Sequence, residues 1–487
     1  MLIVGAGFAG LGTALDLARS GDRDFVVLER SDAVGGTWRQ NIYPGCACDV
    51  PSVLYSYSSE PRHDWRGSHG TQPEILGYLT ELTRRYRLGD HIEFGTTVSG
   101  AHWDESECRW HVTDSAGREF VAQFLVVATG ALNVPRLPRI PGAESFEGPS
   151  MHAAAWRDDV DLTGRRVALI GTGASAIQLA PQLAEAASHL HVFQRTPAWV
   201  LPRREHPVVT ALSRRSMLAH KLFRSATYWS DEALGLGLSR YPRLLGVTEA
   251  RARRHLHRQV ADPGLRAALT PGYRIGCKRI LRSNDFYPTL ARTDTTLVTD
   301  PITEIRPDAV VTADGTAHEV DAIVYATGFR VAGALNRMHL VGRSGVSLLE
   351  RWRRDGVRTH LGITVSGLPN AFLLSGPNTG LGHTSVLVMI EAQIRYVRDA
   401  MRLVDASGVD ALDVRSGVQS VFDEELRDRL SRGVWSTGGC ASWYLNGRGS
   451  NHALWPGSSW GYRRRTRRVD PDDFELLRAA RYAQMHT

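Results

Sequence analysis

The 487-residue sequence predicts an α/β fold with two Rossmann-like dinucleotide-binding domains and a helical insertion. The first observation is a glycine-rich turn over residues 5–10, between a short apolar segment and a stretch with apolar residues at helical spacing. The second is a matching turn over residues 171–176 in the same setting. The third is residues 203–270, where β-branched runs disappear and leucines recur at helical spacing.

The first turn has the GxGxxG pattern that follows the opening strand of a dinucleotide-binding fold. Residues 2–4 are the expected strand. The first glycine permits the tight turn, the second lets the backbone approach a pyrophosphate, and the third lets the helix pack on the strand. A second predicted strand ends at Glu29, whose carboxylate can bind ribose hydroxyls. This turn is predicted to bind FAD or NAD through Gly5, Gly7, Phe8, Ala9, Gly10 and Glu29.

The second turn repeats this pattern and reverses one charge. A predicted strand over residues 167–170 leads into it, and alanine replaces the third glycine, which is an accepted variant. Arg195 lies at the same distance from Gly171 as Glu29 lies from Gly5. An arginine pairs with a 2′-phosphate, whereas a glutamate repels it. The second site is therefore predicted to bind NADPH, through Gly171, Thr172, Gly173, Ala174, Ser175, Arg195 and Thr196.

Two further apolar segments, residues 124–130 and 322–328, end in the same Ala-Thr-Gly sequence. Small residues at a strand end let the backbone pass close to a cofactor, so we expect the chain to cross between two interleaved domains here. From the second segment, the candidate cofactor-binding residues are Ala326, Thr327 and Gly328.

These elements divide the chain into five predicted segments, with a proline-rich linker after the first. The segments are residues 1–135 (first part of the FAD-binding domain), 136–202 (linker and first part of the NADP-binding domain), 203–270 (helical insertion), 271–329 (second part of the NADP-binding domain) and 330–487 (second part of the FAD-binding domain, with a mobile active-site loop). Only three residues precede Gly5 after Met1, so either the first strand is short or the true start lies upstream.

Composition and charge exclude several classes of protein. Hydrophobic residues make up 43% and charged residues 22% of the chain, as in soluble globular proteins. No apolar run reaches the roughly 18 residues of a membrane helix, and the glycine-rich start does not resemble a signal peptide. The net charge is +7, but the arginines are dispersed apart from a short run at 463–468. We therefore expect no nucleic-acid partner and no membrane association.

The five cysteines do not form a recognisable metal or disulfide pattern. Cys46 and Cys48 have no further cysteine partners for zinc, and no CxxC pair occurs. A chain of this length needs neither a disulfide nor a metal to stabilise its core. We therefore expect no bound metal and a reducing, cytoplasmic environment.

Two longer motifs point to one family. Phe146, Gly148, His152 and Trp156 form an FxGxxxHxxxW pattern in the predicted linker. A second pattern consists of Gly35, Gly36, Thr37, Trp38, Tyr43, Pro44, Gly45 and Asp49. Both resemble the motifs of type I Baeyer–Villiger monooxygenases, within the flavin-containing monooxygenase superfamily. One departure is Arg157, where that family usually has Pro or Asp. The resemblance covers nearly the whole chain and is weakest over residues 203–270 and the last twenty.

The resemblance implies an oxygenase with FAD and NADPH as cofactors and a small-molecule ketone and O2 as partners. In this family NADPH reduces FAD, the flavin adds O2 at C4a, and the peroxyflavin anion converts a ketone into an ester or lactone. Lys278-Arg279 resembles the active-site pair of the family. Arg279 is the predicted stabiliser of the anion, since a nearby cation keeps it ionised. Asp49 is its predicted carboxylate partner, and Lys278 is predicted to bind the 2′-phosphate beside Arg195.

The resemblance implies three further features. His152 would transmit cofactor binding to domain rotation. Ser442-Trp443-Tyr444 and Trp455-Pro456-Gly457 resemble a mobile active-site loop in which a tryptophan contacts the nicotinamide cofactor, and the glycines at 433, 438, 439, 447 and 449 fit such a loop. Further flavin-side candidates are Gly36, Thr37, Trp38, Asp49, Tyr55 and Asn378.

Three alternatives remain open from the sequence. A flavin N- or S-oxygenase shares the fold and both cofactors but uses a protonated hydroperoxide; Arg279, Asp49 and Trp156 favour the anion. A reductase acting on a disulfide or carrier would need a CxxC pair near the flavin. A basic nucleic-acid or nucleotide-sensing module does not need two nucleotide sites of opposite charge preference. The sequence names neither the ketone nor the oligomeric state, monomer or dimer.

Overall fold

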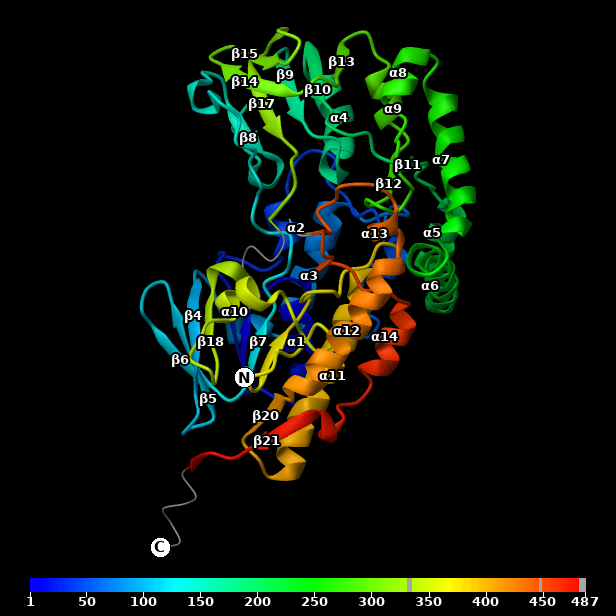
Figure 1. The fold of residues 1–487 in the computed structure, drawn as a ribbon. Coiled ribbons are helices and arrows are strands. Elements are labelled where there is room, and N and C mark those ends of the chain that lie inside the picture. Colours follow the sequence, from blue (N-terminus) through cyan, green and yellow to red (C-terminus); the bar gives the residue numbers. More distant parts are fainter. Residues whose placement is uncertain (331–334, 446–448, 481–487) are drawn as a thin grey trace, which may run out of the picture.

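The computed structural model describes residues 1–330, 335–445 and 449–480, and it has two lobes, each built around a parallel sheet (Figure 1). In Figure 1 the second sheet lies above the first, with β12 (Leu281–Arg282) and α13 (Val434–Thr437) at the level between them. This arrangement confirms the predicted fold class. Within the described residues, no helix is long and apolar enough to cross a membrane.

The sheet of the first lobe has the strand order β19-β7-β1-β2-β3, and all neighbours are parallel. Every residue of β1 pairs with both neighbouring strands, so the short opening strand is held from two sides. Helix α1 contacts β1 and, on its other side, α11. The elements are β1 (Leu2–Val4), α1 (Phe8–Arg19), β2 (Val26–Leu28), β3 (Ile92–Glu93), β7 (Leu125–Val127), β19 (Ala371–Leu373) and α11 (Val386–Ser407).

The sheet of the second lobe has the strand order β13-β10-β9-β17-β8, and it is also parallel throughout. Helix α4 packs against β9, β10 and α9. These elements are β8 (Ser150–His152), β9 (Arg166–Ile170), α4 (Ala174–Ala186), β10 (His189–Phe193), α9 (Phe286–Leu290), β13 (Thr295–Val298) and β17 (Ala322–Tyr325).

Smaller sheets flank the two lobes. A four-stranded sheet of order β18-β4-β5-β6 adjoins the first lobe, and an antiparallel sheet of order β14-β15-β16 adjoins the second. The pairs β11-β12 and β20-β21 complete the strands. Their bounds are β4 (Val98–Asp104), β5 (Arg109–Asp114), β6 (Glu119–Ala122), β11 (Val200–Leu201), β14 (Ile302–Arg306), β15 (Ala309–Thr312), β16 (Ala317–Glu319), β18 (His339–Val341), β20 (Ala411–Val414) and β21 (Phe474–Leu477).

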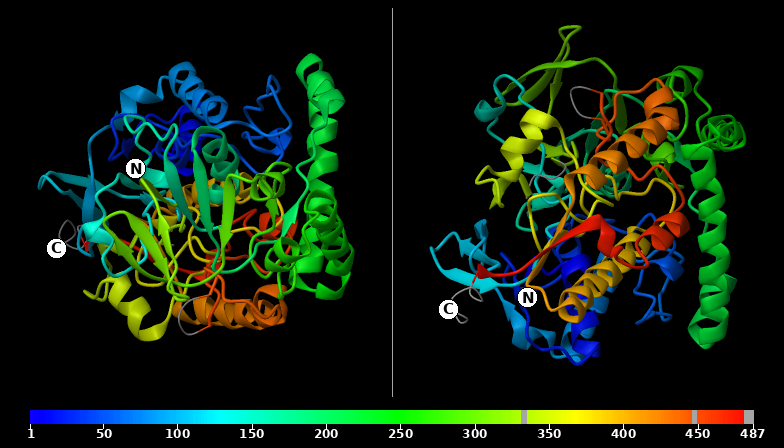
Figure 2. Two further views of the ribbon diagram at one scale, coloured as in Figure 1. Left: turned by 90° about the horizontal axis from the view of Figure 1, so that it is seen from above. Right: turned by 60° about the horizontal axis from the view of Figure 1, so that its bottom comes forward.

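Four consecutive helices occupy the stretch whose composition differs from the rest: α5 (Pro207–Arg215), α6 (Met217–Ser239), α7 (Gly246–Gln259) and α8 (Pro263–Ala268). The long helix α6 stands along one side of the molecule in both views of Figure 2. The remaining helices are α2 (Thr37–Gln40), α3 (Gln72–Arg85), α10 (Leu348–Asp355), α12 (Ser416–Arg432) and α14 (Ser459–Arg465).

A disulfide joins Cys277 to Cys440. The sequence analysis did not predict it, because the five cysteines form no recognisable disulfide pattern. The two residues are 163 positions apart, and only the packing of the segment before β12 against the segment after α13 brings them together. The other cysteines, Cys46, Cys48 and Cys108, are buried free thiols.

Candidate active site at the junction of the two lobes

The first glycine-rich turn lies directly under a crossing strand. Gly5 has φ +105°, and a Cβ there would lie 2.8 Å from the carbonyl oxygen of Ala128. A Cβ on Gly10 would overlap the carbonyl oxygen of Gly5. Helix α1 follows Gly7 with no side chain capping its first N–H groups, so these groups can receive a phosphate.

The carboxylate of Glu29 and a cluster of aromatic side chains lie beside this turn. The buried carboxylate of Glu29 accepts hydrogen bonds from the backbone N–H of Ala6 (2.6 Å) and of Ser31 (2.9 Å), so the predicted ribose ligand also holds the turn. The backbone of Gly36 approaches that of Gly7. The indole of Trp38, which follows Thr37 at the start of α2, donates to the Tyr55 hydroxyl at 3.1 Å. Tyr55 in turn packs edge-on against Phe8, with ring centroids 5.3 Å apart.

The second turn repeats this geometry in the upper lobe. Gly171 has φ +117°, and a Cβ there would lie 2.5 Å from the carbonyl oxygen of Ala326. Helix α4 also begins without a side-chain cap, so the N–H groups of its first turn, at Ala174 and Ser175, can receive a phosphate. The hydroxyl of Thr172 donates to the carbonyl of Thr196 at 3.3 Å, which ties the turn to the segment that follows β10.

Two cations stand beside this second turn. Burial lowers the pKa of Lys278, and the positive charge of Arg195 lowers it further. Among the described residues, no carboxylate forms an ion pair with either side chain. Two unpaired cations close enough to repel each other gain most from a bound dianion, which is the charge of a 2′-phosphate.

His152 lies where the chain crosses between the lobes. It is buried at the end of β8, where its Nδ1 accepts from the N–H of Ala154 (3.1 Å) and its ring packs edge-on against Phe329. Burial lowers its pKa, although the Gly328 backbone acts in the opposite direction. Close to Phe329 in sequence, the hydroxyl of Thr327 donates to the carbonyl of Arg136 at 2.6 Å. This bond joins the segment through which the chain leaves the first lobe to the segment through which it returns.

Arg279 and Asp49 come together at the junction of the lobes. Arg279 Nε donates to Asp49 Oδ2 and Nη2 donates to Oδ1, both at 2.7 Å. Burial alone would raise the pKa of Asp49, but the charge and hydrogen bonds of Arg279 hold it below its ordinary value. The charge of Asp49 raises the pKa of Arg279 further above neutrality, so both groups are ionised at physiological pH.

The segment that carries Asp49 is docked on the second lobe. The hydroxyl of Tyr43 donates to the side-chain oxygen of Gln178 on α4, and the Gln178 amide donates to the carbonyl of Ala47 at 2.9 Å. Gly45 lies against the α4 backbone, where a Cβ would meet the Gln178 carbonyl oxygen at 2.8 Å. The glycine- and proline-containing motif thus spans from the first nucleotide turn to the second lobe.

The structure adds Tyr444 to the residues around Arg279. Tyr444 is buried, and burial raises its pKa to about 12 while the charge of Arg279 acts in the opposite direction. Its neighbour Trp443 is 46% exposed, with its ring centroid 4.5 Å from that of Tyr444. The sequence reasoning did not assign Tyr444, although it lies in the Ser442-Trp443-Tyr444 motif.

One predicted loop residue, Trp455, and one predicted flavin-side residue, Asn378, have mainly structural contacts. Trp455 is 3% exposed and packs between Phe422 and Tyr462, so it belongs to the core and not to a loop over the site. The side chain of Asn378 donates to the carbonyls of Asn451 (2.9 Å) and Leu454 (3.1 Å), which fixes that loop against the first lobe. Gly447 lies outside the described residues.

The comparisons with known proteins agree with this geometry. A family model described as pyridine nucleotide-disulphide oxidoreductase matches residues 2–213. A Baeyer–Villiger monooxygenase of Pseudomonas aeruginosa is 42% identical over 97% of this chain and 90% of its own length. This chain belongs to the Baeyer–Villiger monooxygenase family. It is an FAD- and NADPH-dependent oxidoreductase that inserts one oxygen atom of O2 beside a ketone carbonyl.

Two solved structures extend the similarity to the whole Baeyer–Villiger fold. An oxidised steroid monooxygenase bound to NADP has a TM-score of 0.88 and 32% identity, with 98% of this chain and 99% of that chain covered. OTEMO in complex with FAD and NADP has a TM-score of 0.87 and 28% identity, with the same coverage. The two uncapped helix starts, one beside a carboxylate and one beside two cations, fit these two cofactors.

Proposed function

We propose that Arg279 and Asp49 form the catalytic centre at which this Baeyer–Villiger monooxygenase converts a ketone into an ester or lactone. The observation that carries the proposal is the doubly hydrogen-bonded pair that they form at the junction of the two nucleotide-binding lobes. A flavin on the first lobe and a nicotinamide on the second would meet at such a junction, because ligands bind beyond the carboxyl ends of parallel strands.

In this proposal each lobe holds one cofactor. FAD would be held by Gly5, Gly7, Phe8, Ala9, Gly10, Glu29, Gly36, Thr37, Trp38, Asp49, Tyr55 and Asn378. NADPH would be held by Gly171, Thr172, Gly173, Ala174, Ser175, Arg195, Thr196, Lys278, Ala326, Thr327 and Gly328. The uncapped N-termini of α1 and α4 support pyrophosphate binding, and the unpaired Arg195 and Lys278 support recognition of the 2′-phosphate.

FAD, once bound and reduced, supplies the electrons that activate O2. Arg279 would then stabilise negative charge on an oxygen derived from O2, because a fixed cation beside an anion lowers its affinity for a proton. Asp49 occupies Nε and Nη2, so it orients the guanidinium, while Nη1 has no hydrogen-bond partner among the described residues. The unprotonated oxygen is the nucleophile that attacks a ketone, whereas N- and S-oxygenation need a protonated oxidant.

The other predicted residues would act around this pair. His152, buried and in contact with the returning chain crossing, would pass changes at the NADP site to the linker rather than donate a proton. Trp443, which is exposed beside the buried Tyr444, would contact the nicotinamide cofactor from a mobile loop. These roles are positioning roles, since neither side chain contacts Arg279 in the described contacts.

The ketone is proposed from the same chemistry. Solved relatives are named for steroid and cyclohexanone oxidation, so cyclic ketones are the first class to test. We also propose the division of the chain at residues 135, 202, 270 and 329, and action in the cytoplasm, where NADPH is available.

Isotope labelling tests the proposed reaction. The enzyme is turned over with NADPH, a panel of cyclic ketones and 18O2, and the products are analysed by mass spectrometry. The proposal predicts an ester or lactone that carries one 18O atom, and its formation should depend on NADPH. Oxidation of amines or sulfides without labelled ester from any ketone would contradict it.

A further inference from the structure

We propose that the Cys277–Cys440 disulfide is a redox site that controls how tightly oxygen activation is coupled to ketone oxidation. With the disulfide formed, the segment after Cys440 would hold the buried Tyr444 beside Arg279 and limit the access of water. With the disulfide reduced, that segment would be released and water would reach the site. This inference rests on the catalytic role proposed for Arg279.

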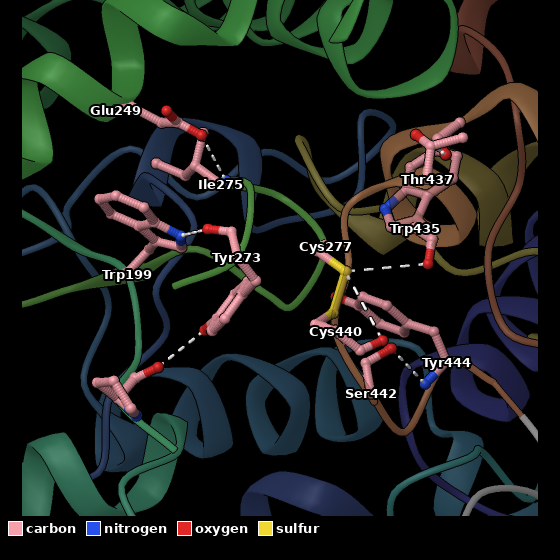
Figure 3. Close-up of a disulfide and its surroundings, with 12 residues drawn as sticks. Trp199, Glu249, Tyr273, Ile275, Cys277, Trp435, Thr437, Cys440, Ser442 and Tyr444 are labelled. Carbon is pink, nitrogen blue, oxygen red and sulfur yellow. Dashed lines mark hydrogen bonds between the residues drawn. A yellow bond between two sulfur atoms is a disulfide. The ribbon is translucent and has the colours of Figure 1, made fainter. Parts of the chain in front are cut away.

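The disulfide is placed close to the catalytic pair on both of its sides. Cys277 lies two residues before Arg279. Cys440 lies four residues before Tyr444, whose pKa is lowered by the nearby charge of Arg279 and raised more strongly by burial. Figure 3 shows Ser442 and Tyr444 beside the sulfur bridge, with Trp435 on the same side. The bridge therefore connects, through two short chain segments, Arg279 and the buried Tyr444 ring beside it.

The two cysteines differ in how firmly their segments are held. The segment before Cys277 is fixed from outside: Trp199 donates to the carbonyl of Tyr273 (2.8 Å), and the N–H of Ile275 donates to Glu249 (3.0 Å), as Figure 3 shows. The segment before Cys440 is held at Gly438, whose carbonyl accepts a hydrogen bond from the N–H of Arg274 at 3.0 Å.

From Gly439 to Trp443, the described residues form no hydrogen bond to another segment, and their covalent link to one is the bond to Cys277. Reduction would therefore release the segment after Cys440 and leave Arg279 in place. Released chain next to a reacting anion admits water, and water exclusion is one way in which active sites suppress side reactions.

The geometry also sets the direction of thiol exchange. Cys277 is fully buried, whereas Cys440 is half-buried beside the exposed Gly439. A thiolate of a dithiol reductant would attack Cys440 Sγ, forming a mixed disulfide, and Cys277 would leave as a thiolate and take up a proton. The second thiol of the reductant then displaces Cys440. The carbonyl of Trp435, 4.0 Å from Cys277 Sγ, can accept from the new thiol.

The established reaction supplies the oxidant for the reverse step. Without a ketone, the two electrons of NADPH and two protons convert O2 into H2O2. H2O2 oxidises the Cys440 thiolate to a sulfenic acid as its O–O bond breaks, and attack by the Cys277 thiol forms the S–S bond; two water molecules are released in total. Uncoupled turnover would thus restore the bridge that suppresses it. Disulfides in reducing compartments are usually of this redox-sensing kind.

Thiol counting and H2O2 release test the proposal together. The full-length holoenzyme is denatured and labelled with a maleimide, and mass spectrometry should count three thiols after H2O2 treatment and five after dithiothreitol. In air-saturated buffer with NADPH and without ketone, the enzyme with a reduced disulfide should release H2O2 about tenfold faster than the enzyme with the disulfide formed. This effect is smaller than the roughly hundredfold effect of displacing a catalytic group by 1 Å. Re-oxidation should reverse the change.

Variants separate the bridge from general effects of the reagents. Cys277→Ser/Cys440→Ser should release H2O2 at the fast rate without reductant and should not respond to dithiothreitol. Cys108→Ala, which removes a buried thiol in the turn between β4 and β5, should behave like the unmodified enzyme. Five thiols after H2O2 treatment, or equal H2O2 release by the oxidised and reduced forms, would overturn the proposal. The thiol count needs no turnover, so it remains informative even if the reaction proposed for Arg279 fails.

Discussion

The two glycine-rich turns share one backbone geometry and differ in their surroundings. Gly7 and Gly173, which precede α1 and α4, have the same φ of −84° and ψ of −167°. Gly5 and Gly171 both have positive φ, and each lies against the carbonyl of an alanine from a crossing strand. The repeated sequence pattern therefore sets the same phosphate-binding shape in both lobes.

The surroundings differ in charge and in exposure. Glu29 is buried and bonded to its own turn, whereas Arg195 is exposed and has no ion pair among the described residues. Two buried aromatic side chains, Trp38 and Tyr55, stand beside the first turn. A flavin stays bound through turnover, whereas NADPH is replaced in every cycle. The glycines fix the backbone, and the neighbouring side chains select the nucleotide and determine how easily it leaves.

The largest expected effect comes from exchanging the third position of the two turns. Gly10→Ala places a Cβ on the carbonyl oxygen of Gly5, which must shift the phosphate-binding turn. We therefore expect the free energy of FAD binding to weaken by about 3 kcal/mol, which is more than a hundredfold in affinity. The matched change in the other lobe, Ala176→Gly, should cost only about 1 kcal/mol of helix stability. Flavin content per chain and Tm measure both. Equal flavin content in the two variants would show that the turns are not distinguished in this way.

The second-largest expected effect concerns Arg195, which stands beside the second turn where Glu29 stands beside the first. Arg195→Ala should raise the KM for NADPH about ten- to a hundredfold and leave the KM for NADH nearly unchanged, because charged hydrogen bonds contribute about 1.5–3 kcal/mol. Steady-state kinetics with both nucleotides check this. Arg306→Ala, at an exposed arginine of the flanking sheet, is the matched control and should change neither KM. A similar rise for both nucleotides would remove the 2′-phosphate assignment.

The smallest expected effect is a pH dependence. Because burial and Arg195 lower the pKa of Lys278, this side chain loses its charge at a lower pH than an ordinary lysine. The kcat/KM for NADPH should therefore fall as pH rises through that lowered pKa, while kcat/KM for NADH should not. Lys278→Arg should flatten the NADPH profile, since a guanidinium stays charged. Parallel profiles for the two nucleotides would contradict the assignment of Lys278.

The fold class and both nucleotide sites could be predicted because their signals are local, whereas the choice of FAD over NAD at the first site came from the family resemblance. A strand, a glycine-rich turn and a helix occupy consecutive residues, and the charge at the end of the next strand lies at a fixed distance from the turn. The pair Arg279 and Asp49 is different, because 230 positions separate them in sequence. Only the resemblance to a family placed them together. In the structure, the segment that carries Asp49 is bonded to Gln178 on α4, and this contact brings Asp49 from the first lobe to Arg279.

The remaining features depend on packing between distant segments. The Cys277–Cys440 bridge joins two loops whose approach no local pattern encodes, although each cysteine stands close to a motif residue. Tyr444 and Trp455 both belong to aromatic motifs near the end of the chain, yet one lies beside Arg279 and the other in the core. A motif identifies the residue type, and only the tertiary fold decides which surface it faces.

The central claim is that Arg279, oriented by Asp49 at the junction of the lobes, stabilises the oxygen anion that attacks the ketone. The most direct test measures ester formation and NADPH oxidation in parallel for the unmodified enzyme and for Arg279→Ala. Ester formation should fall by about 10²–10³, as for the loss of one fixed electrostatic donor, while NADPH oxidation continues and releases H2O2. Ester formation that continues at an unchanged rate in Arg279→Ala would contradict the assignment.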